Sequence, residues 1–351
     1  MTPIPHNRPS LDESDVDAVA AVLRSGHVAH GPEVRAFEEE MAARVGQPGW
    51  DAVAVSSGTA ALYLALKALR IRPGAGVLQP TYACTALVHA TRLAGAEPRL
   101  TDVRDSDFNL DPDAVQAGPE LGAAILPHTY GVPADPGPLA RLGVPVVEDG
   151  AQALGARLGG RAIGGLGALS VFSFYATKPL TSGHGGMVVG PRAACDEIRD
   201  RRDYDGKREL TERFNFHMSD VQAALGRSQL RRLDAFLRRR AETAALYAGA
   251  LPPSLGRQSA PAGAEPNHFR FVLRVRQVEE ARRRLAAAGI TAIVPTEPWE
   301  LLHRQLGLPE AGFPAAETVA RTTLSVPIHP ALTDEERGRV ASALARLADL
   351  D

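Results

Sequence analysis

The chain has 351 residues, of which 44% are hydrophobic and 23% are charged, and its formal net charge is −2. This composition is typical of a globular protein with a large core, and the small net charge argues against a nucleic-acid or membrane-surface partner. The two cysteines, Cys84 and Cys195, lie far apart without CxxC spacing, and no signal peptide is evident. We therefore predict a cytoplasmic protein with neither a disulfide framework nor a bound metal.

The first two thirds of the chain alternate between strand and helix patterns. A capping box, Ser10-Leu-Asp-Glu13, predicts a helix that ends at Gly26, and a second helix is predicted over residues 31–46. Further helices are predicted over 58–70 and 84–95, with strands over 52–57, 76–80, 97–103, 122–129, 144–150, 168–174 and 186–190. Short apolar strands separated by helices indicate an α/β fold whose mostly parallel sheet is covered on both faces.

The last third of the chain predicts a smaller unit. A long helix is predicted over residues 219–251, and the Pro/Gly-rich stretch 252–266 follows it. Beyond that boundary we predict strands over 268–275 and 289–294 and a final helix over 333–350. We therefore divide the chain into a large domain, 1–250, and a small α+β domain, 251–351.

Three polar or aromatic groups follow predicted strands, where open α/β sheets bind ligands. In "VSSGTAAL" (55–62), Gly58 and Thr59 begin a helix whose free N–H groups favour an anion such as phosphate, although Ser57 could simply be an N-cap. Asp149 ends the valine-rich strand of "VPVVEDG", where a buried carboxylate needs a cationic partner or serves as an N-cap. Tyr82 could stack on a flat ligand or pack in the core.

A single lysine, Lys178, stands in "SVFSFYATKPLTSGHGGMVV" (170–189), between a predicted buried strand and a glycine-rich turn. Most lysines are exposed surface residues. A lysine in a poorly hydrated site instead loses proton affinity and can form a Schiff base with a carbonyl group. The sequence contains no GxGxxG, GxxxxGK[ST], GxSxG or HExxH motif that would favour another chemistry.

The order of these motifs resembles that of fold type I pyridoxal-phosphate (PLP) enzymes. More closely, the chain resembles the DegT/StrS-type aminotransferases, which aminate nucleotide-linked keto-sugars. The resemblance covers nearly the whole chain and includes "SGHVAHGPEVRAFEEEMA", "VSSGTAALYLALKAL", "HTYGVPAD", "EDGAQALGA", "SFYATKPLTSGHGG", "NFHMSDVQAALGRSQL" and "FPAAETVARTTLSVPIHPALTDEE".

The resemblance implies a role for each site residue. Lys178 would be the Schiff-base lysine, Asp149 the partner of the pyridine nitrogen, Gln152 a neighbour of the ring and its O3′, and Tyr82 the stacking aromatic. Gly58, Thr59 and the Ser173 hydroxyl would bind the phosphate. Asn215 would reach the phosphate site of a second subunit, which implies a homodimer with shared active sites.

The implied activity is ping-pong transfer of an amino group from glutamate or glutamine to a keto-sugar, with pyridoxamine phosphate (PMP) formed between the two half-reactions. Two alternatives stay open: a PMP-dependent sugar dehydratase, a class in which histidine replaces the lysine, and a non-catalytic regulatory protein. The chain departs from the family pattern at His184, His217 and Val294-Pro295, and these departures predict an unusual acceptor.

Overall fold

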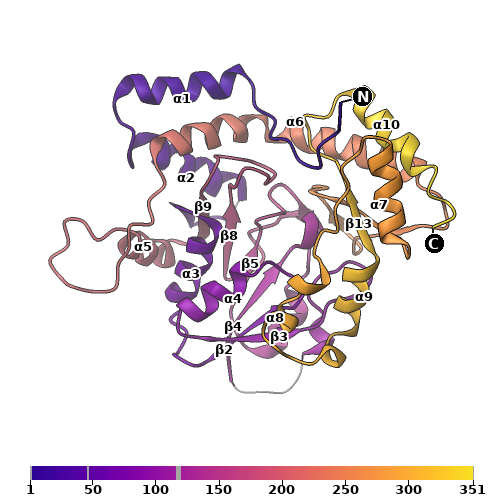
Figure 1. Ribbon diagram of the computed structural model, residues 1–351. Helices are drawn as coiled ribbons and strands as arrows, with labels where there is room; N and C mark the ends of the chain where they lie inside the picture. The colour runs from indigo at the N-terminus through magenta and orange to yellow at the C-terminus, as the bar shows by residue number, and fades with distance from the viewer. Residues whose placement is uncertain (1, 46, 116–119, 351) are drawn as a thin grey trace.

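A seven-stranded sheet forms the centre of the computed structural model, which describes residues 2–45, 47–115 and 120–350 (Figure 1). The strand order is β1-β9-β8-β5-β4-β2-β3. The strands are β1 (Trp50–Val55), β2 (Gly76–Pro80), β3 (Glu97–Thr101), β4 (Leu121–Pro127), β5 (Val146–Asp149), β8 (Leu169–Ser173) and β9 (Gly186–Pro191). Neighbours from β8 to β3 are parallel, and β9 runs antiparallel to both β1 and β8. The predicted mostly parallel sheet is confirmed.

Helices cover both faces of this sheet, as the apolar strands require. Alternate residues of β1 show the two faces: Val53 and Val55 pack in one core cluster, whereas Ala52 and Ala54 pack in another. The first cluster includes residues of α3 (Gly58–Ala68), α4 (Ala86–Leu93) and α5 (Arg192–Arg201). The second includes residues of α2 (Pro32–Val45) and α6 (Asp220–Ala250).

The first helix begins later than predicted. Helix α1 (Glu13–Ser25) has Asp12 as its N-cap: the Asp12 carboxylate accepts the Ser14 N–H, and the Asp15 carboxylate accepts the Asp12 N–H. The predicted cap at Ser10 is therefore wrong, because two aspartates complete the capping box without it. The predicted end is confirmed, since Gly26 takes the left-handed conformation with φ of 77°.

The C-terminal third forms a second, three-stranded sheet in the order β10-β12-β13. Its elements are β10 (Gly256–Arg257), β12 (Phe271–Arg274), α7 (Val278–Ala287), α8 (Leu302–Gln305), α9 (Pro314–Thr322), β13 (Thr323–Val326) and α10 (Asp334–Leu344). A small third sheet joins β11 (Ala264–Glu265), β6 (Arg157–Leu158) and β7 (Arg161–Ala162). Short 3₁₀ helices occur at Pro112–Ala114, Thr129–Gly131, Gly137–Leu142, Pro298–Glu300 and Glu310–Gly312.

The strand predicted over residues 289–294 is wrong. Ile290 forms one isolated bridge with Ile4, and Ile293 forms another with Ser325 of β13. Because these two residues pair with different segments, no continuous ladder forms. Ile4 is fully buried among C-terminal residues, so the beginning of the chain packs with its end.

Helix α6 connects the two cores. It has 31 residues and is therefore about 46 Å long. Leu233 packs against the large sheet, whereas Ala244 and Tyr247 pack in the C-terminal core. Figure 1 shows α6 running from α2 toward α10. The helix ends at the predicted boundary near residue 250, and the division into two domains stays a prediction.

The described residues contain neither a candidate membrane-spanning helix nor a candidate metal site. None of the described helices is both long and apolar enough to cross a bilayer. Within the same residues, no three His, Cys, Asp or Glu side chains converge as metal ligands would.

Candidate active site

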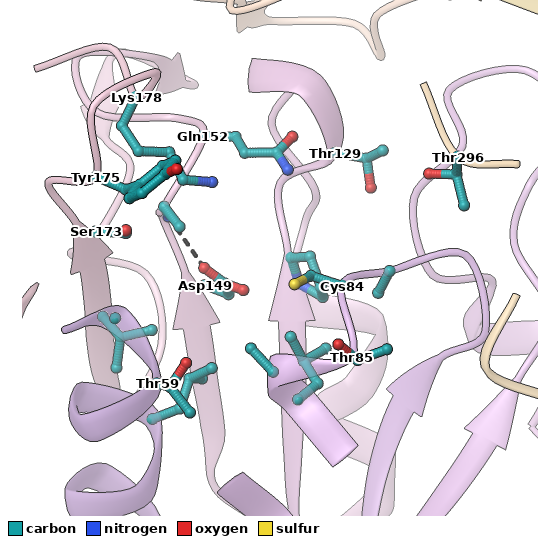
Figure 2. A pocket seen from close by; sticks show the side chains of 18 of the residues that line it. Thr59, Cys84, Thr85, Thr129, Asp149, Gln152, Ser173, Tyr175, Lys178 and Thr296 are labelled. Atoms are coloured by element: carbon teal, nitrogen blue, oxygen red, sulfur yellow. Dashed lines mark hydrogen bonds between the residues drawn. The ribbon is translucent and has the colours of Figure 1, made fainter. Parts of the chain in front are cut away.

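A cavity of about 710 Å³ opens at the carboxyl edge of the large sheet. Its walls include the segments that follow β1, β2, β4, β5 and β8, which is the position expected for a ligand site in an open α/β sheet. Its volume lies within the range of ordinary small-molecule sites. Figure 2 shows side chains from these segments around the same space.

The cavity brings together all the predicted site residues except Asn215. The lining includes Gly58, Thr59, Tyr82, Asp149, Gln152, Ser173 and Lys178. Asn215 is exposed on the long segment between α5 and α6 and does not line the cavity of its own chain.

The N-terminus of α3 forms one end of the cavity. The Ser57 hydroxyl caps this helix by accepting the Ala60 N–H at 3.1 Å, and the amides of Gly58 and Thr59 precede the first intrahelical hydrogen bonds. A Cβ atom at Gly58 would lie 2.9 Å from the Cβ of Ser173. Glycine therefore lets the helix end lie against β8, beside the Ser173 hydroxyl. These amides, the hydroxyl and the positive helix end can hold a phosphate.

Asp149 ends β5 and presents a carboxylate to the cavity. Its Oδ1 accepts the Ala151 N–H at 3.0 Å, and it forms no ion pair within the described parts of the chain. Burial raises the pKa of Asp149, and the Ala151 amide and the charge of Lys178 oppose that rise. No α-helix begins here, so Asp149 is not a helix N-cap. A cationic N–H donor in the cavity would complete its environment.

Lys178 lies in the turn after β8 and extends into the same space. Burial is the main cause that lowers its pKa, and the charge of Asp149 acts in the opposite direction. Its Nζ lies 5.6 Å from the centroid of the Phe269 ring. Figure 2 shows the Lys178, Asp149 and Gln152 side chains around one region of the cavity. An amine held in this environment favours its neutral, nucleophilic form.

Gln152 has a defined orientation. Its Oε1 accepts the backbone N–H of Tyr130 at 2.8 Å, and Tyr130 has the left-handed φ of 57°. The Gln152 amide nitrogen is therefore the end available to a ligand. The Tyr130 hydroxyl donates to the Tyr82 hydroxyl at 3.0 Å. Tyr82 is 2% exposed, so it is both a core aromatic and part of the cavity wall, and its stacking on a ligand stays a prediction.

The sequence did not predict several residues of the cavity. Three of them, Cys84, Thr85 and Tyr175, stand in the same motifs as Tyr82 and Lys178 but were not singled out. The wall contributed by the C-terminal third contains Arg270, Pro295, Thr296, Trp299, Glu300 and Gln305. The departure from the family pattern at Val294-Pro295 had indicated Pro295; no short motif marks the others, because distant contacts bring them to the cavity.

The departures from the family pattern lie in different places. His184 lines the cavity, with its ring 5.2 Å from that of Tyr175, and Pro295 also lines it. His217 lies outside the cavity, with its Nε2 3.4 Å from a carboxylate oxygen of Asp203. Two of these departures are therefore placed to contact a ligand in this chain.

Comparison with curated sequences reveals relatives that cover nearly the whole chain. A transaminase for dTDP-3-amino-3,4,6-trideoxy-alpha-D-glucose from Streptomyces venezuelae is 36% identical over 95% of this chain and 91% of its own. A UDP-N-acetyl-3-dehydro-alpha-D-glucosamine 3-aminotransferase from Acidithiobacillus ferrooxidans is 31% identical over 97% of this chain and 95% of its own.

Solved structures agree with this relationship. S. venezuelae DesV, solved in complex with a ketimine intermediate, superposes with a TM-score of 0.89 at 34% identity and covers 97% of this chain and 95% of its own. Spr1654 from Streptococcus pneumoniae has been solved in PLP and PMP forms, and both superpose with a TM-score of 0.91 over 99% of this chain and 98–99% of their own. At 23% identity, Spr1654 shows the fold alone.

The profile of the DegT/DnrJ/EryC1/StrS aminotransferase family matches residues 9–345. The match extends over both cores and every segment that lines the cavity. The chain therefore belongs to the DegT/DnrJ/EryC1/StrS aminotransferase family and is an aminotransferase.

Proposed function

We propose that this aminotransferase uses PLP to move an amino group from glutamate or glutamine to the keto group of a nucleotide-linked sugar. The observation that carries the proposal is that one cavity receives the Lys178 amine, the Asp149 carboxylate and the anion-binding end of α3. The names of the relatives support a nucleotide-linked acceptor.

The residues present fit this cofactor at both of its charged ends. Gly58, Thr59 and Ser173 would hold the phosphate, because the lack of a Cβ atom at Gly58 lets the helix end lie against Ser173. Asp149, which lacks a cationic partner among the described side chains, would bind the protonated ring nitrogen. When bound, PLP supplies an electron-accepting ring that allows an amino group to leave one molecule and join another.

Lys178 would transfer the protons of the reaction. Burial lowers its pKa and so makes the neutral amine easier to reach; when free, this amine can take the proton from the donor carbon and later return a proton to the acceptor. Gln152 would donate from its amide nitrogen, because Oε1 is already held by Tyr130. Each of these polar groups at the sheet edge therefore has one proposed role: to bind the phosphate, to bind the ring nitrogen, to donate a hydrogen bond or to transfer a proton.

We further propose that the active unit is a homodimer. Asn215 is exposed and does not line its own cavity, and the carbonyl of the neighbouring Phe216 accepts the Ser56 N–H at 2.8 Å. A residue in that position can contribute to the phosphate site of a second copy. We place the reaction in the cytoplasm, and the free thiols of Cys84 and Cys195 agree with a reducing compartment.

An isotope experiment tests the proposed reaction. The protein, loaded with PLP, is given amino-¹⁵N glutamate or glutamine and a panel of nucleotide-linked keto-sugars, and the products are analysed by mass spectrometry. We expect a product that carries ¹⁵N and an equal amount of keto acid. A product that forms without donor consumption would instead indicate the dehydratase, and bound PLP without turnover on any keto-sugar would favour the non-catalytic alternative.

A further inference from the structure

Phe269 is a buried aromatic residue that stands apart from the apolar cores. It is 6% exposed, yet none of the apolar core clusters in the described part of the chain includes it. It also does not line the active-site cavity. A core aromatic residue packs among apolar side chains, so packing alone does not explain the position of this ring, and the assignments above give it no role.

Three cations surround the Phe269 ring. The ring centroid lies 5.6 Å from the Lys178 Nζ, 5.9 Å from the Arg240 Cζ and 5.5 Å from the Arg270 Cζ. The electron-rich face of an aromatic ring attracts a cation within about 6 Å of its centroid, and all three groups lie inside that range. One ring is therefore shared by the amine that we propose to react and by two guanidinium groups.

None of these three cations forms an ion pair with an acid among the described residues. The Arg240 Nη1 donates to the carbonyl oxygen of Phe269 at 3.1 Å, and the Arg270 Nε has no hydrogen-bond partner in the same part of the chain. Burial and the charge of Arg270 lower the pKa of Arg240 to about 10, so Arg240 is charged at neutral pH. Because like charges repel strongly in a poorly hydrated site, a group that attracts all three stabilises the arrangement.

The backbone around Phe269 is anchored to the sheet edge. The Phe269 N–H donates to the Asn267 Oδ1 at 2.9 Å. The Asn267 Nδ2 in turn donates to the carbonyl oxygens of Gln152 at 2.9 Å and Leu154 at 3.0 Å. Gln152 and Leu154 belong to the segment that follows Asp149. One asparagine therefore connects the residue that carries the ring to the segment that carries the proposed ring-nitrogen partner.

We propose that Phe269 is a positioning residue that holds the Lys178 amine and increases its affinity for a proton. This inference rests on the proposed function, in which Lys178 transfers the protons. Burial and the charge of Arg270 lower the pKa of Lys178, and the charge of Asp149 opposes them. The ring attracts only the protonated amine, so it acts in the same direction as Asp149. A group that must both accept and return a proton works best when neither form is strongly favoured.

The test measures how fast acetic anhydride acetylates Lys178 in cofactor-free protein, because this reagent reacts only with the neutral amine. Peptide mass spectrometry gives the rate relative to that of Lys207, which pairs with Asp200 outside the cavity. Phe269→Leu keeps an apolar side chain but removes the ring. We expect it to raise the relative rate about 4-fold below the pH at which wild-type Lys178 loses its proton. Above that pH the amine is neutral in both proteins, so the rates should agree.

Two further variants separate the charge distribution of the ring from its bulk. Phe271→Leu removes a buried aromatic ring of the C-terminal core, which packs against Tyr247, and it should leave the acetylation of Lys178 unchanged. Replacing Phe269 with 3,5-difluorophenylalanine keeps nearly the same shape but withdraws electrons from the ring face. We expect this replacement to raise the relative rate about 2-fold over the same pH range. It carries the test if Phe269→Leu does not fold.

Two results would overturn the role of Phe269. An equal increase at every pH would mean that Phe269→Leu only opens access to Lys178, and a fluorinated ring without effect would mean that the ring does not act on the charge of the amine. These measurements need no PLP, so they do not depend on the reaction. Failure of the wild-type protein to bind PLP would instead overturn the proposed function.

Discussion

The two sides of the cavity differ in origin and in what they offer a ligand. The sheet edge, formed by Gly58, Asp149, Ser173 and Lys178, presents groups that follow strands directly. The C-terminal wall, formed by Arg270, Pro295, Thr296, Trp299, Glu300 and Gln305, presents groups from the last third of the chain. The sheet edge suits a ligand of fixed shape, whereas the wall can vary while the sheet edge stays the same. The difference suggests that the sheet edge determines the chemistry and the wall selects the substrates.

Replacing Lys178 gives the largest expected effect and tests the sheet edge. Lys178→Ala should lower the rate of the donor half-reaction by about 10⁴-fold, because it removes the amine that we propose to carry the proton. The chain has three lysines, and Lys207→Ala removes one that pairs with Asp200 outside the cavity. Single-turnover absorbance measurements on both variants provide the comparison. A similar loss in both, or in neither, would contradict the role of Lys178.

A methyl group at position 58 tests the phosphate end of the sheet edge. The Cβ of Gly58→Ala would lie 2.9 Å from the Ser173 Cβ and 3.2 Å from its Oγ, so α3 and β8 must separate. We expect the dissociation constant for PLP to rise about 30-fold, measured by fluorescence titration of cofactor-free protein. Gly249→Ala adds the same atom to α6 in open space and should leave PLP binding unchanged. Equal affinity in both variants would exclude Gly58 from the phosphate site.

The buried amine should also reduce the stability of the cofactor-free protein. Because the folded-state pKa of Lys178 is lowered from its ordinary value of 10.5, the unfolded chain binds more protons between the two values and stability rises with pH there. Lys178→Met should therefore increase the free energy of unfolding at neutral pH by about 1–2 kcal/mol. Urea unfolding at several pH values should show this gain shrinking toward pH 10.5. A gain independent of pH would contradict the lowered pKa.

Trp299 gives the smallest expected effect and tests the wall. This side chain is 68% exposed at the cavity, so an acceptor can gain only part of the contact energy of a buried aromatic residue. Trp299→Ala should raise the KM for the acceptor about 5-fold and leave the donor half-reaction unchanged. Steady-state kinetics with the acceptor varied checks this expectation. A change in the donor half-reaction alone would contradict the proposal that the wall selects the acceptor while the sheet edge determines the chemistry.

The sequence predicted most of the sheet edge because its signals are local. Short apolar runs end in turns, and polar residues at those turns share one edge of a parallel sheet, which brought Gly58, Asp149 and Lys178 together as expected. The family resemblance supplied the roles of Gln152 and Ser173, which no local pattern indicates. The misplaced cap at Ser10 shows the limit of a motif when two alternatives, Ser10 and Asp12, stand two residues apart.

Apart from Pro295, the sequence could not predict the C-terminal wall. Arg270 reaches the cavity because it precedes β12, whose Val272 packs in one cluster with Tyr82 and Tyr130. The apolar residues of the segment 289–294 predicted a strand, but its partners, Ile4 and Ser325, belong to opposite ends of the chain. Contacts between such distant segments leave no periodic signal in the sequence.

The most direct test of the central idea is chemical capture of the cofactor. Protein loaded with PLP is reduced with borohydride, digested and mapped by mass spectrometry, with Asp149→Asn as a companion sample. We predict that the wild-type protein carries the reduced cofactor on the peptide that contains Lys178, and that Asp149→Asn is labelled there less completely at the same PLP concentration. Label on Lys67 or Lys207 in its place, or no label at all, would contradict the account.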